Sequence, residues 1–586
     1  MPNAPTITGR CRAALWLLLV LLTLAILQFP THLVFEYRPV QSPYIFDNLP
    51  LFAVLFCIWL SVLLLLLFSR RGEGESDWEK MALVCIFSAV FLGFWTIVTH
   101  DGLYGEGIYN AAHVKYLNEV AKIPVGHEGL FYFDFPGLHV IGSFVSQSTG
   151  LDAIGASATI TFFQALLLAA LLYVLFRRLL NSAYFAPLAV MLVIQGNISL
   201  DKLNFFHPRN LGVVLLVVFL LLLSRHRLFG TTRDGLIVII LLAAVTMVHA
   251  VTSFLLFSIM LGIYIVQKLD RTNVVNAPSL TIFLVFPLAW AVYWAVITLE
   301  GVVGTLPKVV EDFSERGDVL WFFTTVQQAN VGERLPVWAN IPRLFWWVMI
   351  YGFGSILGLW NLFRLKKLSL MEKRFTGVLL GIILISAVST LASRGGARFD
   401  TYILYGAFAA VPILLWFLLS FRNHIRRYAF VCLVILFFIL SFPTFLSHNS
   451  MIAFGYYYPY EHASGKFLEF SFAEDKELHL FGGKWVKHAT RYYVPNAYFH
   501  TEYEVLDMKD EAGLWVEIER LGSSFEGRAG YQEGEAIFIW SKRLMVPYQH
   551  FFRVTPEHPR WQEFGDRLAA HDKIYDSGDI QMFSAH

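Results

Sequence analysis

The stretch LPLFAVLFCIWLSVLLLLLFS occupies residues 49–69 and is followed at once by Arg70 and Arg71. A helix needs about 20 consecutive apolar residues to cross the hydrocarbon core of a bilayer, and this stretch supplies them without a single charge. The two arginines after it are typical of a loop on the cytoplasmic side. This segment therefore predicts a membrane-spanning helix and the direction in which the chain crosses.

Composition extends this prediction to the whole chain. Of the 586 residues, 56% are hydrophobic and 15% are charged, whereas soluble domains carry about 25% charged residues. The net charge of +1 gives no reason to expect a nucleic-acid partner. The four cysteines lie in or beside apolar runs, without the spacing of a metal site or a disulfide framework. We therefore expect a polytopic α-helical membrane protein.

Thirteen apolar segments are expected to span the bilayer. The pair 235–250 and 252–267 is so closely spaced that it could form a broken hairpin. The segments are 13–35, 49–69, 81–99, 151–176, 183–200, 209–224, 235–250, 252–267, 278–299, 342–363, 375–392, 401–420 and 428–446.

Basic residues give these spans an orientation. Every second connection is rich in Lys or Arg, from Arg10 and Arg12 before the first span to Arg426 and Arg427 before the last. Because basic loops stay in the cytoplasm, this alternation places the N terminus inside and the C terminus outside. The external connections then include two long ones, 100–150 and 300–341.

The last 140 or so residues differ in character. After residue 446 the sequence mixes polar and aromatic residues, which divides the chain into a membrane domain, 1–446, and a small external α/β domain, 447–586. Within it, Glu535–Trp540 and Ile580–Phe583 are predicted strands and Trp561–Ala570 a helix, with Lys573–Gly578 as a turn into the last strand.

The external loop 100–150 holds the most informative residues. Asp101 directly follows a span, where a carboxylate is costly unless it faces protein or a watery cavity. The segment Ile108–Ile123 has apolar residues interspersed with polar ones such as His113 and Lys115, and 136–147 is apolar but too short to span. Both are predicted to be interfacial helices.

This loop resembles the first external loop of the GT-C superfamily of membrane glycosyltransferases, which includes protein O-mannosyltransferases and aminoarabinose transferases. The likeness rests on Asp101 after a span, the interfacial helix, and the element Phe135-Pro136-Gly137-Leu138. The family's loop begins with an acidic pair. Here the second acidic position is Gly102, and the next carboxylate is Glu106.

The resemblance implies catalytic roles for these carboxylates. Asp101 would be the general base, with Glu106 as a second catalytic candidate. A divalent metal, Mg²⁺ or Mn²⁺, with Asp101 as a ligand is left open, although Gly102 favours a base mechanism without a metal. By the local alternative, Asp101 only caps a helix or marks the membrane boundary.

The resemblance also implies that arginines bind the donor phosphate. Arg394 and Arg398 lie in the external turn SRGGARFDTY before a span, where many GT-C proteins bind a lipid-linked phosphate, and Arg209 is a third candidate. Local alternatives are an ion pair of Arg398 with Asp400 and snorkelling of Arg209. Further site candidates, which could instead be histidines with satisfied local hydrogen bonds, are His113, His207 and His249.

We therefore expect a multi-pass enzyme of the cell membrane. It would transfer a sugar from a polyprenyl-phosphate donor in the bilayer to a glycan, protein or lipid acceptor outside. Two alternatives are a transporter or flippase and a non-catalytic envelope assembly protein. A transporter predicts internal repeats and ionisable residues at mid-membrane, whereas the ionisable residues near these spans cluster at their outer ends.

Overall fold

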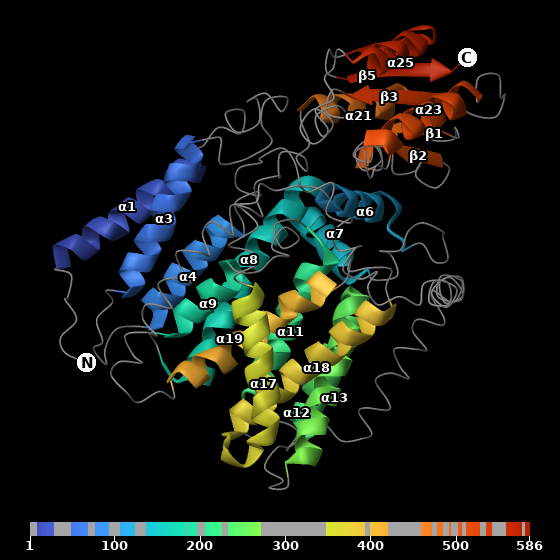
Figure 1. Ribbon diagram of the computed structural model, residues 1–586. Coiled ribbons are helices and arrows are strands. Elements are labelled where there is room, and N and C mark those ends of the chain that lie inside the picture. The colour runs from blue at the N-terminus through green and yellow to red at the C-terminus, as the bar shows by residue number, and fades with distance from the viewer. Residues whose placement is uncertain are drawn as a thin grey trace.

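A computed structural model gives the fold, in which the elements described as far as residue 419 are helices and those after it form an α/β unit (Figure 1). The structure describes residues 9–27, 49–67, 77–92, 106–123, 136–182, 185–195, 206–225, 232–270, 347–392, 399–419, 459–471, 478–483, 492–493, 502–506, 511–527, 535–541, 558–576 and 580–585. The helices of the first part are α1 (Gly9–Leu27), α3 (Leu49–Leu67), α4 (Asp77–Phe91), α6 (Glu106–Val120), α7 (Gly137–Thr149), α8 (Ala153–Leu180), α9 (Phe185–Gln195), α11 (Pro208–Leu223), α12 (Thr232–Val248), α13 (Ala250–Leu269), the π-helical η4 (Trp347–Phe353), α17 (Gly354–Phe363), the 3₁₀ turn η5 (Leu365–Lys367), α18 (Leu370–Ala392) and α19 (Phe399–Leu419).

Helices lie at eleven of the thirteen predicted spans. The other two segments, 278–299 and 428–446, fall outside the described residues. By length and composition, α8 and the Thr252–Leu269 part of α13 are long and apolar enough to cross a membrane, and the other apolar helices are shorter over their described lengths. The number of spans and the orientation of the termini remain predictions.

The longest helix, α8, shows how local sequence sets its ends. Asp152 precedes it in an extended conformation, and its side chain accepts a hydrogen bond from the N–H of Gly155 at 2.7 Å. The helix ends where Asn181 adopts a left-handed conformation with φ of 46°. An N-cap carboxylate and a left-handed residue are common signals for the start and end of a helix.

A seam of small residues joins α13 and α18. A Cβ added to Gly377 would lie 2.7 Å from the Cα of Ile263, and one on Gly381 would lie 2.6 Å from the Cα of Ile259. Ser258 crosses the same seam, because its hydroxyl donates a hydrogen bond to the carbonyl of Gly381 at 2.7 Å. Close approach through glycine is a frequent means of helix association in membrane proteins.

The basic end of α18 is anchored by buried polar contacts. Lys373 Nζ lies 2.8 Å from Asp270 Oδ2, and both side chains are almost fully buried. Arg374 donates to the carbonyl oxygens of Leu223 and Arg225 at the end of α11. The start of α18 and the ends of α11 and α13 thus meet at one end of the bundle.

The α/β unit is built on a five-stranded sheet in the order β2-β1-β3-β5-β4. Strand β1 is parallel to β2 and β3, whereas β5 is antiparallel to β3 and β4. Its elements are α21 (Pro459–Ser471), β1 (Leu478–Gly483), β2 (Glu502–Leu506), α23 (Glu511–Gly527), β3 (Glu535–Ser541), α25 (Pro559–Ala569), β4 (Asp572–Asp576) and β5 (Ile580–Ala585).

The two faces of this sheet bury different partners. Phe538 on β3 packs with Ile518 of α23 and Phe564 of α25. Its neighbours Ile537 and Ile539 point to the other face and join a cluster that includes residues of α6, α7 and α8. This alternation follows the two-residue period of a strand, and it separates a helix-covered face from a face directed toward the membrane domain.

One local prediction in this unit was wrong. The segment Lys573–Gly578 was expected to be a turn, but Asp572–Asp576 forms strand β4 beside β5. Ile574 and Tyr575 are partly buried against the cluster on the domain-facing side of the sheet, so packing favours a strand where the polar sequence pattern predicted a turn.

Candidate functional site

Two helices that are predicted to start at the external face, α11 and α13, both begin with a histidine cap. Nδ1 of His207 accepts a hydrogen bond from the backbone N–H of Arg209 at 3.0 Å. Nδ1 of His249 accepts one from the N–H of Thr252 at 3.3 Å. These rings take the capping role that Ser, Thr, Asp or Asn usually fills at a helix start.

The two capped helix starts lie together. A Cβ added to Gly212 in α11 would lie 2.6 Å from Oγ1 of Thr252 in α13, so only a glycine allows this approach. The ring centroids of His207 and His249 are 6.1 Å apart, with the rings edge to face. The positive ends of two helix dipoles are therefore directed at one region.

The hydrogen bonds also fix the tautomer of both capping histidines. An Nδ1 atom that accepts from a backbone N–H carries no proton, so a neutral ring has its proton on Nε2. Thr252 Oγ1, 2.9 Å from Nδ1 of His249, is then a donor as well. The neutral rings of His207 and His249 therefore carry their hydrogen-bond donor at Nε2.

A buried arginine follows in the first turn of α11. Arg209 is 7% exposed, and the next residue, Asn210, is 3% exposed. A buried arginine in the first turn of α11, whose start packs against the start of α13, adds positive charge near the positive ends of two helix dipoles. Such an arrangement is suited to bind a phosphate or another oxyanion.

A second pair of histidines lies on the loop helices. The rings of His113 on α6 and His139 on α7 stack with centroids 4.9 Å apart, and both side chains are buried. His139 Nε2 donates to Oδ1 of Asn110 at 3.0 Å, and His113 Nδ1 donates to the carbonyl of Tyr109 at 2.9 Å. These contacts orient both rings from within α6.

His139 joins the two pairs, and sequence reasoning missed it. Its ring contacts Phe206, the residue before His207, with centroids 6.2 Å apart. Burial, together with the nearby His113 and His207, holds the pKa of His139 well below its ordinary value, so the ring is neutral at neutral pH. The available signal was that His139 is the one ionisable residue in the apolar stretch 136–147.

We call this group the histidine layer, and it unites four of the predicted site residues, His113, His207, Arg209 and His249. The other predicted residues are not tested by it. Glu106 is the first residue of α6, and only its backbone is described. Asp101, Arg394 and Arg398 lie outside the described residues. The layer consists of Asn110, His113, His139, His207, Arg209 and His249.

The described part of the chain contains no group of three or more His, Cys, Asp or Glu side chains placed to hold a metal ion. In the histidine layer, the Nδ1 atoms of His207 and His249 are already engaged as helix caps. A Mg²⁺ or Mn²⁺ ion prefers oxygen ligands, which these rings do not offer. The histidine layer does not fit such an ion.

Helix α6 does not expose the polar face that the sequence predicted for it. Its side chains from Ile108 to Val114 are buried, and His113 is 3% exposed. Helix α6 packs on α7 and α8, and it shares a cluster with Tyr492 and Tyr493. The predicted polar face is covered because residues far along the chain pack on it, and the position of α6 relative to a membrane stays a prediction.

Helix α7 keeps a feature expected of an interfacial helix. Leu138 and His139 are fully buried, whereas Val140, Ile141 and Phe144 are 45%, 42% and 69% exposed. Large apolar side chains are exposed on one side only. This exposed side suits contact with lipid, and the buried side carries His139 into the histidine layer.

Comparisons with known proteins add little to this geometry. No protein-family model and no curated protein matches the chain. The chain is similar to the crystal structure of ArnT from Cupriavidus metallidurans bound to undecaprenyl phosphate, with 14% identity, 86% of this chain and 98% of that chain covered, and a TM-score of 0.37. For ArnT of the same organism in the apo state, the identity is 12%, the coverage 87% and 99%, and the TM-score 0.44. Similarity at these TM-scores decides neither fold nor activity.

Proposed function

We propose that this protein is an integral-membrane glycosyltransferase that takes its sugar from a polyprenyl-phosphate donor. The observation that carries the proposal is the convergence of Arg209 with the capped starts of α11 and α13, where His207 and His249 hold Nε2–H donors. This site suits the phosphate of a lipid-linked sugar, since it lies at the ends of apolar helices. Undecaprenyl phosphate, the ligand named for one ArnT structure, is of the same chemical class.

The proposed reaction is a single displacement with inversion at the sugar. Asp101 takes the proton from an acceptor hydroxyl, whose oxygen attacks the anomeric carbon. The bond between that carbon and the phosphate oxygen breaks, and the phosphate leaves with the electron pair. Arg209, with Arg394 and Arg398 from the external turn, stabilises the leaving phosphate, whose negative charge grows as the bond breaks.

The histidine layer contributes hydrogen-bond donors whose protonation state stays the same during the proposed reaction. Because the rings of His207 and His249 are neutral with Nε2–H, they can hydrogen-bond a phosphate oxygen throughout the reaction. His113 and His139 orient α6 and α7 against this region through their stacked rings. The chain's own residues thus bind the leaving group and keep the loop helices in place.

The test uses the purified full chain in nanodiscs with undecaprenyl-phosphate-linked mannose, glucose and arabinose as donors. We expect transfer from at least one donor, and a loss of about 100-fold or more in Asp101→Asn, within the range of general-base catalysis. Arg209→Gln should lower kcat/KM with a clear part of the loss in kcat, because Arg209 stabilises charge that grows as the bond breaks. Arg178→Gln, at the predicted cytoplasmic end of α8, is the matched control.

Two results would contradict the proposal. Unchanged transfer in Asp101→Asn would remove Asp101 as the base. If the wild-type protein in liposomes moves the labelled lipid between leaflets but transfers no sugar, the flippase alternative is correct.

A further inference from the structure

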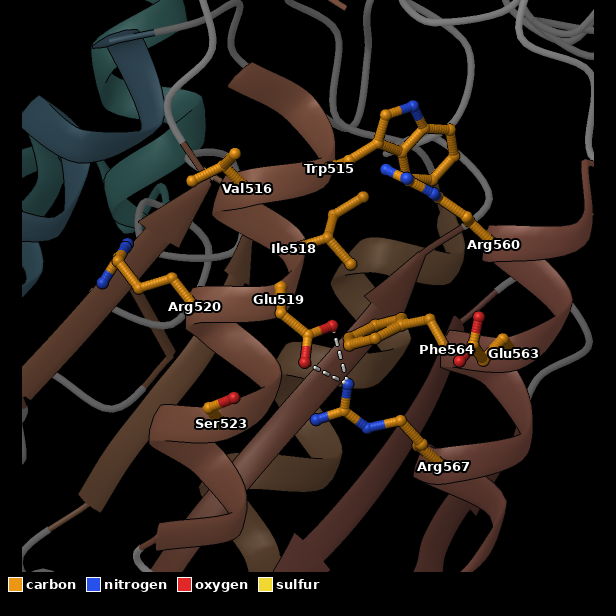
Figure 2. Close-up of a pocket in the computed structure, with 10 residues that line it drawn as sticks. All are labelled: Trp515, Val516, Ile518, Glu519, Arg520, Ser523, Arg560, Glu563, Phe564 and Arg567. Carbon is orange, nitrogen blue, oxygen red and sulfur yellow. Dashed lines mark hydrogen bonds and ion pairs between the residues drawn. The ribbon is translucent and has the colours of Figure 1, made fainter. Parts of the chain in front are cut away.

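A groove in the C-terminal α/β unit lies apart from the histidine layer. Helices α23 and α25 cover the same face of the sheet, and between them is an open groove of about 580 Å³ (Figure 2). This volume is within the range of about 300–1,000 Å³ that small-molecule sites have. Its floor is apolar, with Ile518 and Phe564 at 5% and 4% exposure. The cluster on the opposite face of the sheet includes Ala112, Leu138 and Phe206, which directly neighbour histidines of the histidine layer in the sequence.

One end of the groove presents an oriented arginine. The guanidinium carbon of Arg560 lies 5.6 Å from the ring centroid of Trp515, which also stacks on His558 at 4.6 Å. No carboxylate lies within ion-pair distance of Arg560 in the described ranges. A guanidinium held against an aromatic ring keeps its N–H groups available at its edge. Arg560 can therefore donate hydrogen bonds to a ligand.

At the other end of the groove, Arg567 forms ion pairs with Glu519 and Glu526. Arg567 binds Glu526 through two parallel hydrogen bonds of 2.8 Å, and its third nitrogen is 2.9 Å from both carboxylate oxygens of Glu519. The hydrogen bonds with Glu526 raise the pKa of Arg567 and hold the pKa of Glu526 below its ordinary value. In this network the exposed Glu519 lies against Arg567 on the groove wall (Figure 2).

Arg520 on α23 also lines the groove, with its side chain extending away from α25 (Figure 2), and two further exposed polar side chains complete the lining. Glu563 lies on the α25 wall, and no Lys or Arg of the described residues forms an ion pair with it. Ser523 lies on the α23 wall (Figure 2). A carboxylate accepts hydrogen bonds only, whereas a hydroxyl both donates and accepts. Donors and acceptors therefore alternate around an apolar floor.

This mixture of positive and negative side chains disfavours the binding of strongly charged ligands. An anion in the groove would lie close to Glu519 and Glu563, and a cation would lie close to Arg560 and Arg567. Hydroxyl groups can donate to the two carboxylates and accept from the guanidinium groups, and the C–H faces of sugar rings can contact the apolar floor. We propose that the groove between α23 and α25 binds a neutral oligosaccharide.

Binding in this groove does not require any transfer reaction. That the bound saccharide is the acceptor chain of the enzyme is a further step, which rests on the proposed function. The two can fail separately, because saccharide binding can be measured in a protein that transfers nothing.

The experiment measures ligand binding to the full chain in nanodiscs by saturation-transfer NMR and calorimetry. The probes are the neutral trisaccharides maltotriose, mannotriose and chitotriose, the anionic trigalacturonate and the cationic trilysine. We expect at least one neutral trisaccharide to bind, and Glu563→Gln and Arg560→Ala to weaken it roughly tenfold, the effect of losing a charged hydrogen-bond partner. Gln562→Ala, on the same helix but outside the groove lining, should bind as the wild type does.

Further variants separate binding from folding and from transfer. Trp515→Ala should weaken binding by releasing Arg560, and because it could also perturb α23, Arg560→Lys provides the same test with charge and exposure kept. Asp101→Asn should bind the trisaccharide normally. The proposal is wrong if no neutral trisaccharide binds, if only trigalacturonate or trilysine binds, or if Glu563→Gln and Arg560→Lys both bind at wild-type strength.

Discussion

Lys115 on α6 and Glu469 on α21 form an ion pair, with Nζ 2.8 Å from Oε1, across 354 residues of sequence. The Lys115 ammonium also lies 5.4 Å from the ring centroid of Tyr492 and 3.5 Å from the carbonyl oxygen of Tyr493. Lys115 therefore links the helix that carries His113 to the C-terminal unit. The polar residue that the sequence assigned to an exposed helix face instead connects two parts of the protein.

We expect Lys115→Glu to loosen this connection. The change places two carboxylates together and removes the contact with Tyr492, for a loss of about 1–2 kcal/mol given that the pair is partly exposed. Hydrogen exchange should show faster exchange in α6. The double variant Lys115→Glu with Glu469→Lys again places opposite charges together, so it should recover part of the protection of α6 from hydrogen exchange. Glu119→Gln, which removes only a contact within α6, should leave it unchanged, and equal effects in the single and double variants would contradict a direct pairing.

The seam between α13 and α18 should not tolerate a side chain at Gly381. Its added Cβ would lie 2.6 Å from the Cα of Ile259, so Gly381→Ala forces two helix backbones apart and Gly381→Leu does so further. We expect Gly381→Ala to cost about 1–3 kcal/mol and Gly381→Leu more. Thermal unfolding in detergent measures this, with exposed Ala387→Leu on the same helix as the control. A wild-type midpoint for Gly381→Leu would show that the helices do not pack this closely.

The helices could be predicted from sequence because their signal is local. An apolar run of about 20 residues with basic ends is sufficient, and helices lie at eleven of the thirteen segments predicted in this way. The burial of α6 could not be predicted, because Tyr492 and Tyr493 cover it from almost 380 residues away. Periodicity within a helix gives its apolar face but not the distant segments that shield its polar face.

The candidate site was predicted in part for a related reason. His207 and His249 stood out because each lies at the end of an apolar run, which is visible in sequence. That their Nδ1 atoms cap the two helices depends on backbone geometry. His139 was missed because its importance comes from packing against His113 and Phe206, on other elements. Asp101, Arg394 and Arg398 stay predictions.

The cap and ligand roles of His249 can be separated by substitution. Asparagine is a good N-cap but lacks an Nε2–H in the same position, whereas alanine lacks both. We expect His249→Ala to destabilise the protein by about 1 kcal/mol and to weaken donor binding. His249→Asn should keep the stability but still bind the donor more weakly. The measurement is the thermal shift that undecaprenyl phosphate produces in each variant. An equal shift in wild type and His249→Asn would mean that His249 only caps α13.

Stability should depend on pH through His139. Its pKa is lowered in the folded protein by burial and by the nearby His113 and His207, whereas in the unfolded chain it is about 6.5. Below about pH 6.5 the unfolded chain therefore binds a proton that the folded protein does not, and stability falls as the pH decreases, by at most about 1.4 kcal/mol per pH unit for one group. Above pH 7 the contribution is constant.

His139→Gln keeps a donor for Asn110 and removes the titration, so its unfolding midpoint should fall less than that of the wild type between pH 7 and 5. Gln562→Ala, which removes no titratable group, is the control that should leave the wild-type slope intact, and identical slopes in wild type and His139→Gln would show that His139 is not a buried neutral ring.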